Sequence, residues 1–274
     1  MRVYVMMDIE GVAGVVHSEE GMKGNPEYER ARRLMTNEAS AIVQGIFDAD
    51  PEAQVTVVDS HGSYRNMIPE LLDDRASILR GKPRVGGMMD GIDHGYDFAI
   101  FGGVHGRGSQ GESVLSHTFT GHLLDIRING ASCGELELNS MIAGFYDVRV
   151  AMVSGDQHVT ENAHTLLGAD AIVVTTKQSH GALAGENISP NRSCALLRAA
   201  AKEATEKWHA ATVVTPPAPV SIEIEFDRPV YADLALLVDG AERISGRVVR
   251  FERPTFREAF RLLRLLTVLC STPV

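Results

Sequence analysis

Cysteine is scarce in this sequence. Only three occur among 274 residues, namely Cys133, Cys194 and Cys270. Their odd number and wide spacing argue against a disulfide framework and against a zinc site built from thiolates. We expect all three to be small, buried thiols.

Long hydrophobic runs are also missing. No stretch approaches the roughly 18 consecutive apolar residues that suggest a membrane-spanning helix, and only a few apolar residues precede Asp8. Hydrophobic residues still make up 44% of the chain, which is enough for one large core or two unequal ones. We therefore expect a cytoplasmic protein that has no membrane partner.

Positive charge is in the minority. The formal net charge is -10 at pH 7, and no cluster of Lys and Arg with interleaved aromatic residues offsets it. A negative protein repels polyanions, so nucleic acid is a poor candidate partner. Small molecules or peptides fit better.

The sequence pattern predicts strands and helices that alternate along the chain. Apolar, β-branched runs include the N-terminus, "AQVTVVDSHG", "YDFAIFGGVHG", "VRVAMVSGD" and "AIVVTTKQ". A helix is predicted from about Pro26 to Asp48, because Asn25 supplies an N-cap and proline suits the first helical position. "HLLDIRINGAS" predicts a hairpin, and "GELELNSMIAGFY" a helix. The pattern predicts a three-layer α/β/α fold with a mainly parallel central sheet.

The chain changes character after residue 212. "VVTPPAPV" predicts an extended linker, since consecutive prolines cannot continue a helix or a central strand. "SIEIEF" and "GRVVRFE" predict strands, and Thr255 with Glu258 forms a capping box for a final helix. We expect an α/β domain over residues 1–212 and a smaller α+β region over residues 213–274 packed on it.

Polar side chains follow three of the predicted core strands. Asp8 and Glu10 end the first, Asp59 and His61 the second, and His105 the third. Each has an ordinary explanation as a turn or capping residue. In open α/β sheets, however, the ends of parallel strands converge on one ligand site. Their coincidence favours a functional site.

Glu135, at the start of a predicted helix, extends this set. An acidic residue in a first turn also complements the helix dipole, so its role depends on whether it faces the strand ends. If it does, three carboxylates and two imidazoles form a donor set that suits zinc or a similar divalent ion. Two divalent ions and one hydroxide balance three carboxylates, whereas one ion leaves negative charge. A two-metal hydrolytic centre is therefore favoured.

A glycine-rich segment, "GRGSQG", follows His105 and formally matches a dinucleotide-binding fingerprint. The residues after it do not predict a convincing amphipathic helix, so we interpret it as a loop that admits substrate, with a nucleotide site as the minority alternative. His117 follows this loop. It is a candidate acid or base, although a partly buried loop histidine is the alternative that position alone leaves open.

At these positions the sequence resembles the zinc-dependent D-aminopeptidases of the bacterial dipeptide-operon DppA type. The similarity rests on "DIEG", "DSH", "GVHGR", "SH" and "GELELN", in the family's order and with family-like spacings, and it extends over nearly the whole chain. The resemblance implies two zinc ions per chain held by Asp8, Glu10, His61, His105 and Glu135, with Asp8 bridging. It also implies that His117 is the catalytic residue, which the family description makes a nucleophile.

The activity implied is hydrolysis of short peptides or amides with an N-terminal D-amino acid, such as D-alanine, by a homo-oligomer, namely a decamer of stacked pentamers. Proton transfer by His117 is physically easier than its direct attack on an amide. Asp59 and Asp156 are expected to orient the histidine ligands, and Lys177 to contact a substrate carboxylate. Three alternatives remain: a di-metal amidohydrolase or peptidase of other specificity, a nucleotide-binding oxidoreductase, and a metal-storing protein without turnover.

Overall fold

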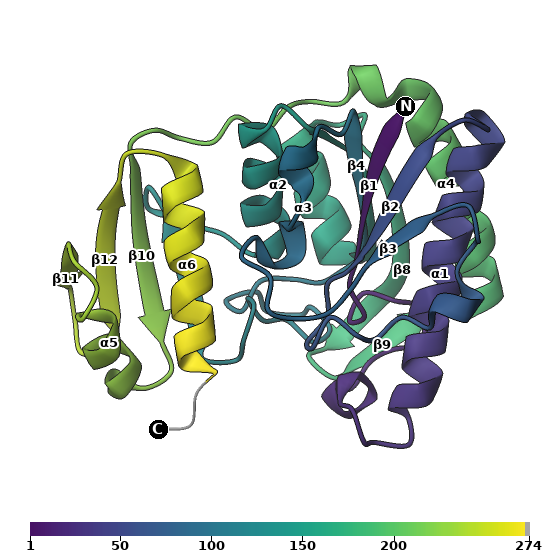
Figure 1. Ribbon diagram of the computed structural model, residues 1–274. Coiled ribbons are helices and arrows are strands. Elements are labelled where there is room, and N and C mark those ends of the chain that lie inside the picture. The colour runs from purple at the N-terminus through teal and green to yellow at the C-terminus, as the bar shows by residue number, and fades with distance from the viewer. Residues whose placement is uncertain (272–274) are drawn as a thin grey trace.

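A computed structural model describes residues 1–271 of the chain (Figure 1). Its larger sheet has seven strands in the order β3-β2-β1-β4-β7-β8-β9, all parallel to their neighbours except β9, which runs antiparallel to β8. The strands are β1 (Arg2–Met7), β2 (Gln54–Asp59), β3 (Ser77–Leu79), β4 (Phe98–Val104), β7 (Arg149–Asp156), β8 (Ile172–Gly181) and β9 (Ala184–Asn187).

Strand β1 shows why this sheet lies at the centre. Val3 and Val5 pack into the core on one face, while Tyr4 and Met6 pack into the core on the other. Successive side chains of a strand point to opposite faces, so a strand covered on both sides must be apolar throughout. The run of apolar residues before Asp8 therefore marks a strand buried on both faces.

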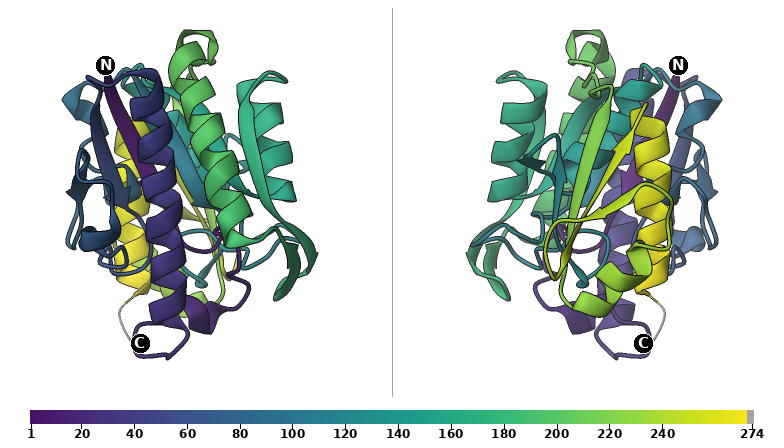
Figure 2. Two further views of the ribbon diagram at one scale, coloured as in Figure 1. Left: turned by 90° about the vertical axis from the view of Figure 1, so that its right-hand side faces the viewer. Right: turned by 90° about the vertical axis from the view of Figure 1, so that its left-hand side faces the viewer.

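Helices cover both faces of the larger sheet. These are α1 (Tyr28–Ala49), α2 (Glu135–Phe145), α3 (Gln157–Leu167) and α4 (Pro190–Lys207), while α5 (Pro229–Ala235) and α6 (Phe256–Cys270) pack against the smaller sheet described below. Short 3-10 helices span Ser18–Gly21, Pro69–Leu71, Gly87–Met89, Ile92–His94 and Trp208–Ala210. Helices α1 and α4 lie side by side on one face, and α2 and α3 lie on the other (Figures 1 and 2). The predicted three-layer α/β/α fold is confirmed.

A smaller antiparallel sheet lies beyond α2, in the order β11-β12-β10-β5-β6. Its strands are β5 (Leu123–Ile128), β6 (Ala131–Ser132), β10 (Val220–Phe226), β11 (Ala241–Arg243) and β12 (Val248–Arg253). Helix α6 packs between this sheet and α2, as the yellow helix of Figure 1 shows. Because β5 and β6 come from the middle of the chain, the small sheet is not built from residues 213–274 alone. The division of the chain into a domain over residues 1–212 and a smaller region over residues 213–274 stays a proposal.

Local predictions hold in several places. The hairpin about Asn129 forms between β5 and β6, and the capping box of Thr255 and Glu258 begins α6. Helix α1 begins at Tyr28, later than predicted, because the backbone after Asn25 first makes a turn.

Within residues 1–271, no helix is both long and apolar enough to cross a membrane.

Candidate metal centre

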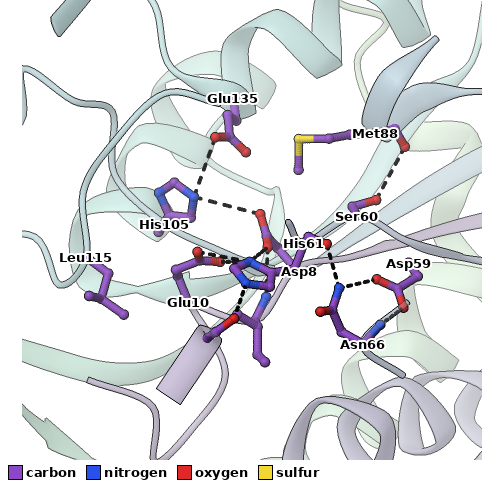
Figure 3. Close-up of polar contacts among 12 residues, drawn as sticks. Asp8, Glu10, Asp59, Ser60, His61, Asn66, Met88, His105, Leu115 and Glu135 are labelled. Atoms are coloured by element: carbon purple, nitrogen blue, oxygen red, sulfur yellow. Dashed lines mark hydrogen bonds and ion pairs between the residues drawn. The ribbon is translucent and has the colours of Figure 1, made fainter. Parts of the chain in front are cut away.

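The polar residues that follow the first three predicted core strands meet at the carboxyl ends of strands in the larger sheet. Strands β1, β2 and β4 are parallel neighbours, so the residues that follow them emerge together. Asp8, Glu10, His61 and His105 are thereby brought into one cluster, and Glu135, the first residue of α2, faces it (Figure 3). The topology, rather than any local motif, assembles the five side chains.

Asp8 lies between two histidines. Its Oδ1 is 3.4 Å from His61 Nδ1, which is 3.0 Å from Glu10 Oε1. Its Oδ2 is 3.7 Å from His105 Nε2, which is 3.6 Å from Glu135 Oε1. The cluster therefore divides into two groups of three donors that share Asp8, and within each group the donor atoms lie within 4.8 Å of one another.

Backbone carbonyls orient both imidazole rings. His61 Nε2 lies 3.0 Å from the Gly21 carbonyl oxygen, and His105 Nδ1 lies 3.0 Å from the Gly106 carbonyl oxygen. Each of these ring nitrogens donates its hydrogen to the carbonyl, which directs the other nitrogen of the ring at the carboxylates. His105 Nε2 is buried and has no hydrogen-bond partner within the described residues. An unpaired buried nitrogen aimed at carboxylates fits a cation between them.

The electrostatics of the cluster point the same way. Burial raises the pKa of Asp8 well above its usual value, and neighbouring Glu10 raises it further. Burial alone would lower the pKa of His105, but the surrounding carboxylates, Glu135 foremost, raise it to about 9. Without a metal the cluster thus retains protons because its carboxylates repel one another. A divalent cation can replace those protons.

His117 lies beside this cluster, on the loop between β4 and β5. Its Nδ1 donates to the Leu115 carbonyl oxygen at 2.9 Å, and its Nε2 is 4.0 Å from Glu10 Oε1. Its ring stacks on that of His105. Burial and the neighbouring His105 lower the pKa of His117, which favours the neutral ring. Glu10, His105 and His117 also bring three donor atoms within 4.8 Å, so geometry alone leaves His117 as either a ligand or a free base.

The expectations for Asp59 and Asp156 are wrong. The Asp59 carboxylate accepts hydrogen bonds from the Asn66 and Met67 amides. Asp156 caps α3 and accepts from the loop residue Ser113. Both carboxylates are thus occupied by backbone and loop donors, as turn and cap residues usually are, and neither orients a histidine ring.

The expectation for Lys177 is also wrong. Its side chain is 1% exposed, and Nζ donates to the carbonyl oxygens of Glu10 (2.7 Å) and Val15. Burial lowers its pKa to about 8 even though Glu38 opposes the shift. Lys177 therefore ties the loop that carries Glu10 to strand β8 and does not face substrate. A lysine within a predicted core strand was the one signal in the sequence for this role.

The glycine-rich segment over residues 106–111 is followed by more loop and then by strand β5. A dinucleotide site of the fingerprint type requires a helix directly after the glycines, whose N-terminus holds the pyrophosphate. Since that helix is absent from this part of the described chain, the nucleotide alternative loses its structural basis.

Two cavities open on the donor cluster. The first, which we call the apolar cavity, has a volume of about 530 Å³. The cluster residues Glu10 and His61 and the neighbouring His117 line it. Its apolar lining includes Ile9, Val15, Met22, Leu115 and Leu183.

The second, which we call the cationic cavity, has a volume of about 300 Å³. Its lining includes Asp8, His61, His117 and Glu135, and also Tyr64, Lys82, Phe119 and Arg264. The presence of Lys82 and Arg264 in this cavity could not be predicted from the sequence, because Lys82 lies on a loop after β3 and the position of Arg264 depends on how α6 packs.

Carboxylates and imidazoles cluster at the strand ends of a mainly parallel α/β sheet, and two cavities reach them. This arrangement is typical of α/β enzymes that bind metal ions. The family is then defined by comparison with known proteins. The model of the peptidase M55 family, the D-aminopeptidases, matches residues 1–265. The chain belongs to this family of peptidases, as its resemblance predicts.

Two similar proteins support the assignment. A D-aminopeptidase of Bacillus subtilis (strain 168) is 31% identical over 270 residues, which cover 98% of this chain and 97% of that protein. The solved structure of the Zn-dependent D-aminopeptidase DppA from Bacillus subtilis, described as a self-compartmentalizing protease, superimposes with a TM-score of 0.94. It is 30% identical, with all of both chains covered.

Proposed function

We propose that this chain is a di-zinc aminopeptidase that hydrolyses short peptides or amides with an N-terminal D-amino acid, D-alanine peptides in particular. The observation that carries the proposal is the pair of three-donor groups that share Asp8. The solved relative of 30% identity is Zn-dependent, which supports zinc as the metal.

The donor set suits two zinc ions. One ion would be held by Asp8, Glu10 and His61, and the other by Asp8, His105 and Glu135. Zinc accepts carboxylate oxygen and imidazole nitrogen together, and two divalent ions offset the charge of three buried carboxylates better than one. Two zinc ions held there would supply Lewis-acid polarisation of the scissile carbonyl and an activated water at neutral pH.

The protein's own contribution to the chemistry centres on His117. Because the Leu115 carbonyl fixes the hydrogen on Nδ1, the lone pair of Nε2 is free to take a proton from water and then to return one to the leaving amine. Stacking on His105 holds the ring in that orientation. We therefore propose His117 as a general acid and base, with direct nucleophilic attack as the alternative that the family resemblance implies.

The two cavities suggest how a peptide lies across the centre. The apolar cavity suits the side chain of the N-terminal residue, because apolar residues line the wall next to Glu10 and His61. The remainder of the substrate would then extend into the cationic cavity. This placement puts the scissile amide against the donor cluster.

The test is a panel of D- and L-aminoacyl amides and dipeptides, assayed with zinc present. We expect turnover of D-alanine substrates and much slower turnover of their L-counterparts. Preference for L-substrates would contradict the proposed chirality but keep a metallopeptidase. The absence of any hydrolysis by a protein that contains two metals would overturn the enzyme assignment.

We also propose a homo-oligomer, a decamer as the resemblance implies. Helix α6 presents two exposed apolar side chains, Leu265 (55% exposed) and Val268 (59% exposed), which a partner copy would cover. The self-compartmentalizing relative supports assembly. Light scattering should give a mass several times the 29.7 kDa of the chain; a stable monomer would overturn this proposal. The cytoplasmic location stays a prediction.

A further inference from the structure

Three cations gather around Tyr64, and two of them, Lys82 and Arg264, line the cationic cavity with it. The Arg84 guanidinium carbon is 3.8 Å from the centre of the Tyr64 ring, and Lys82 Nζ is 4.8 Å from it. Arg264 approaches from α6, with its Nη2 3.4 Å from Tyr64 Oη. Two segments far apart in the sequence thus bring positive charge to the same wall.

These cations lack counter-ions. Within residues 1–271, no carboxylate oxygen of Asp or Glu lies within 4 Å of a side-chain nitrogen of Lys82, Arg84 or Arg264. Burial lowers the pKa of Lys82, and the two nearby arginines lower it further. The wall therefore carries positive charge that repels itself.

Arg264 is the deepest of the three. Its residue is 9% exposed, and its Nε is buried without a hydrogen-bond partner among the described residues. The guanidinium fits closely against Gly87, where an added Cβ would fall 2.3 Å from Nε. A buried guanidinium that makes one hydrogen bond, to Tyr64, and has no carboxylate partner is costly unless a ligand completes it. A role in packing alone would be served at lower cost by an apolar side chain.

Because these cations share a cavity with the donor cluster, a negatively charged group of the substrate is the ligand that we expect them to bind. Lys82 and Arg264 line the same cavity as Asp8 and Glu135. In a dipeptide, the terminal carboxyl carbon lies only about 2.5 Å from the scissile nitrogen, and each further residue moves it roughly 3.3–3.6 Å away. When the amide of a very short peptide lies at the donors, its free carboxylate therefore lies in the same cavity as these cations.

We propose that Arg264 and Lys82 bind the free α-carboxylate of a short peptide substrate. This inference rests on the proposed peptidase function and names the residues that recognise the C-terminus of the substrate. The planar guanidinium suits two parallel hydrogen bonds to a carboxylate. Lys82, which is exposed at the mouth of the cavity, adds a second positive charge.

The test compares two substrates that differ only in charge, D-alanyl-D-alanine and D-alanyl-D-alaninamide, on the zinc-loaded enzyme. In Arg264→Met and Lys82→Met, KM for the dipeptide should rise roughly ten- to hundredfold, the loss expected for hydrogen bonds to a charged group. KM for the amide should change less than about threefold. Equal changes for both substrates, or none, would overturn the proposal.

Two further variants guard against misfolding. Arg261→Met removes a positive charge from an exposed position on the same helix, one turn earlier, and should leave the ratio of the two KM values unchanged. Arg264→Lys keeps the charge and should recover part of the preference for the dipeptide. Because Lys82 is exposed, its variant tests the subsite even if Arg264→Met is unstable.

A binding measurement separates this proposal from the proposed function. D-alanyl-D-alanine is titrated calorimetrically into zinc-loaded His117→Ala and into the His117→Ala/Arg264→Met double variant, with the amide as the matched ligand. Weaker binding of the dipeptide alone in the double variant supports the carboxylate subsite, whether or not turnover occurs. Unchanged binding contradicts the subsite, whereas failure of the wild-type enzyme to hydrolyse either compound contradicts only the peptidase assignment.

Discussion

His117 lies flat against His105, with ring centroids 4.2 Å apart and ring planes inclined by 9°. Of these two stacked histidines, only His105 has a nitrogen near two carboxylates, Asp8 and Glu135. Nε2 of His117 faces Glu10 alone, at 4.0 Å. The two adjacent imidazoles thus have different surroundings. This difference is consistent with the proposal that His105 is a metal ligand and His117 a catalytic base.

Variants of His117 and of Glu135 should therefore lose activity for different reasons. His117→Ala should keep the metals and substrate affinity while lowering turnover by about 10²–10⁴-fold, as expected when an acid or base is removed. Glu135→Ala should lose metal, and excess zinc should restore part of its activity. Kinetics and elemental analysis on both variants check this contrast. If His117→Ala loses metal as readily as Glu135→Ala, His117 is a ligand.

The sharing of Asp8 predicts a stepwise pattern of metal content. Elemental analysis should find about two zinc ions per wild-type chain. Glu135→Ala should lower the occupancy of one of them, because Glu135 belongs to a single donor group, whereas Asp8→Ala should lower both. A wild-type ratio near one that added zinc does not change would remove the two-metal proposal.

Lys177→Met should weaken the fold and the centre together. Methionine fills a similar volume but leaves the buried carbonyls of Glu10 and Val15 without their donor. The free energy of unfolding should fall by on the order of 2–4 kcal/mol, and zinc affinity should fall because the Glu10 loop is no longer held. Lys202→Met, on the exposed side of α4, is the matched control. Normal zinc binding by Lys177→Met would show that the lysine does not position this loop.

The glycine after Glu10 is predicted to tolerate no side chain. A Cβ on Gly11 would fall 2.1 Å from the Val104 carbonyl oxygen, in the backbone that leads to His105. Gly11→Ala should cost roughly 1–3 kcal/mol of stability through overpacking and reduce zinc content. Gly246→Ala, where nothing lies within 4 Å, should be nearly neutral. Thermal unfolding of the two variants measures the difference.

The cysteines should be unreactive in the native protein. Cys133 and Cys270 are buried as expected, whereas Cys194 is only partly buried. Burial raises the pKa of Cys133 to about 12, and that of Cys194 and of Cys270 to about 11. At pH 8 the reactive thiolate is therefore rare, so alkylation by iodoacetamide should be slow until the chain is unfolded. Mass spectrometry of protein treated with and without denaturant tests this. Rapid native labelling of Cys133 would contradict its burial.

The sequence predicted much of the site because parallel strands deliver their ends to one edge. The clustering of Asp8, His61 and His105 follows from that topology alone. The partners of Asp59 could not be predicted, since nearby backbone amides compete for a carboxylate and sequence order does not say which wins. The roles of Lys177 and Arg264 depend on contacts across more than 150 residues, which periodicity does not encode.

Arg264 comes from a helix that packs against the small sheet, while the five clustered donors follow strands of the large sheet or begin α2. The proposed carboxylate subsite and the donor cluster therefore belong to different parts of the chain. On this proposal, substitutions in α6 would change which peptides bind while the donors stay in place.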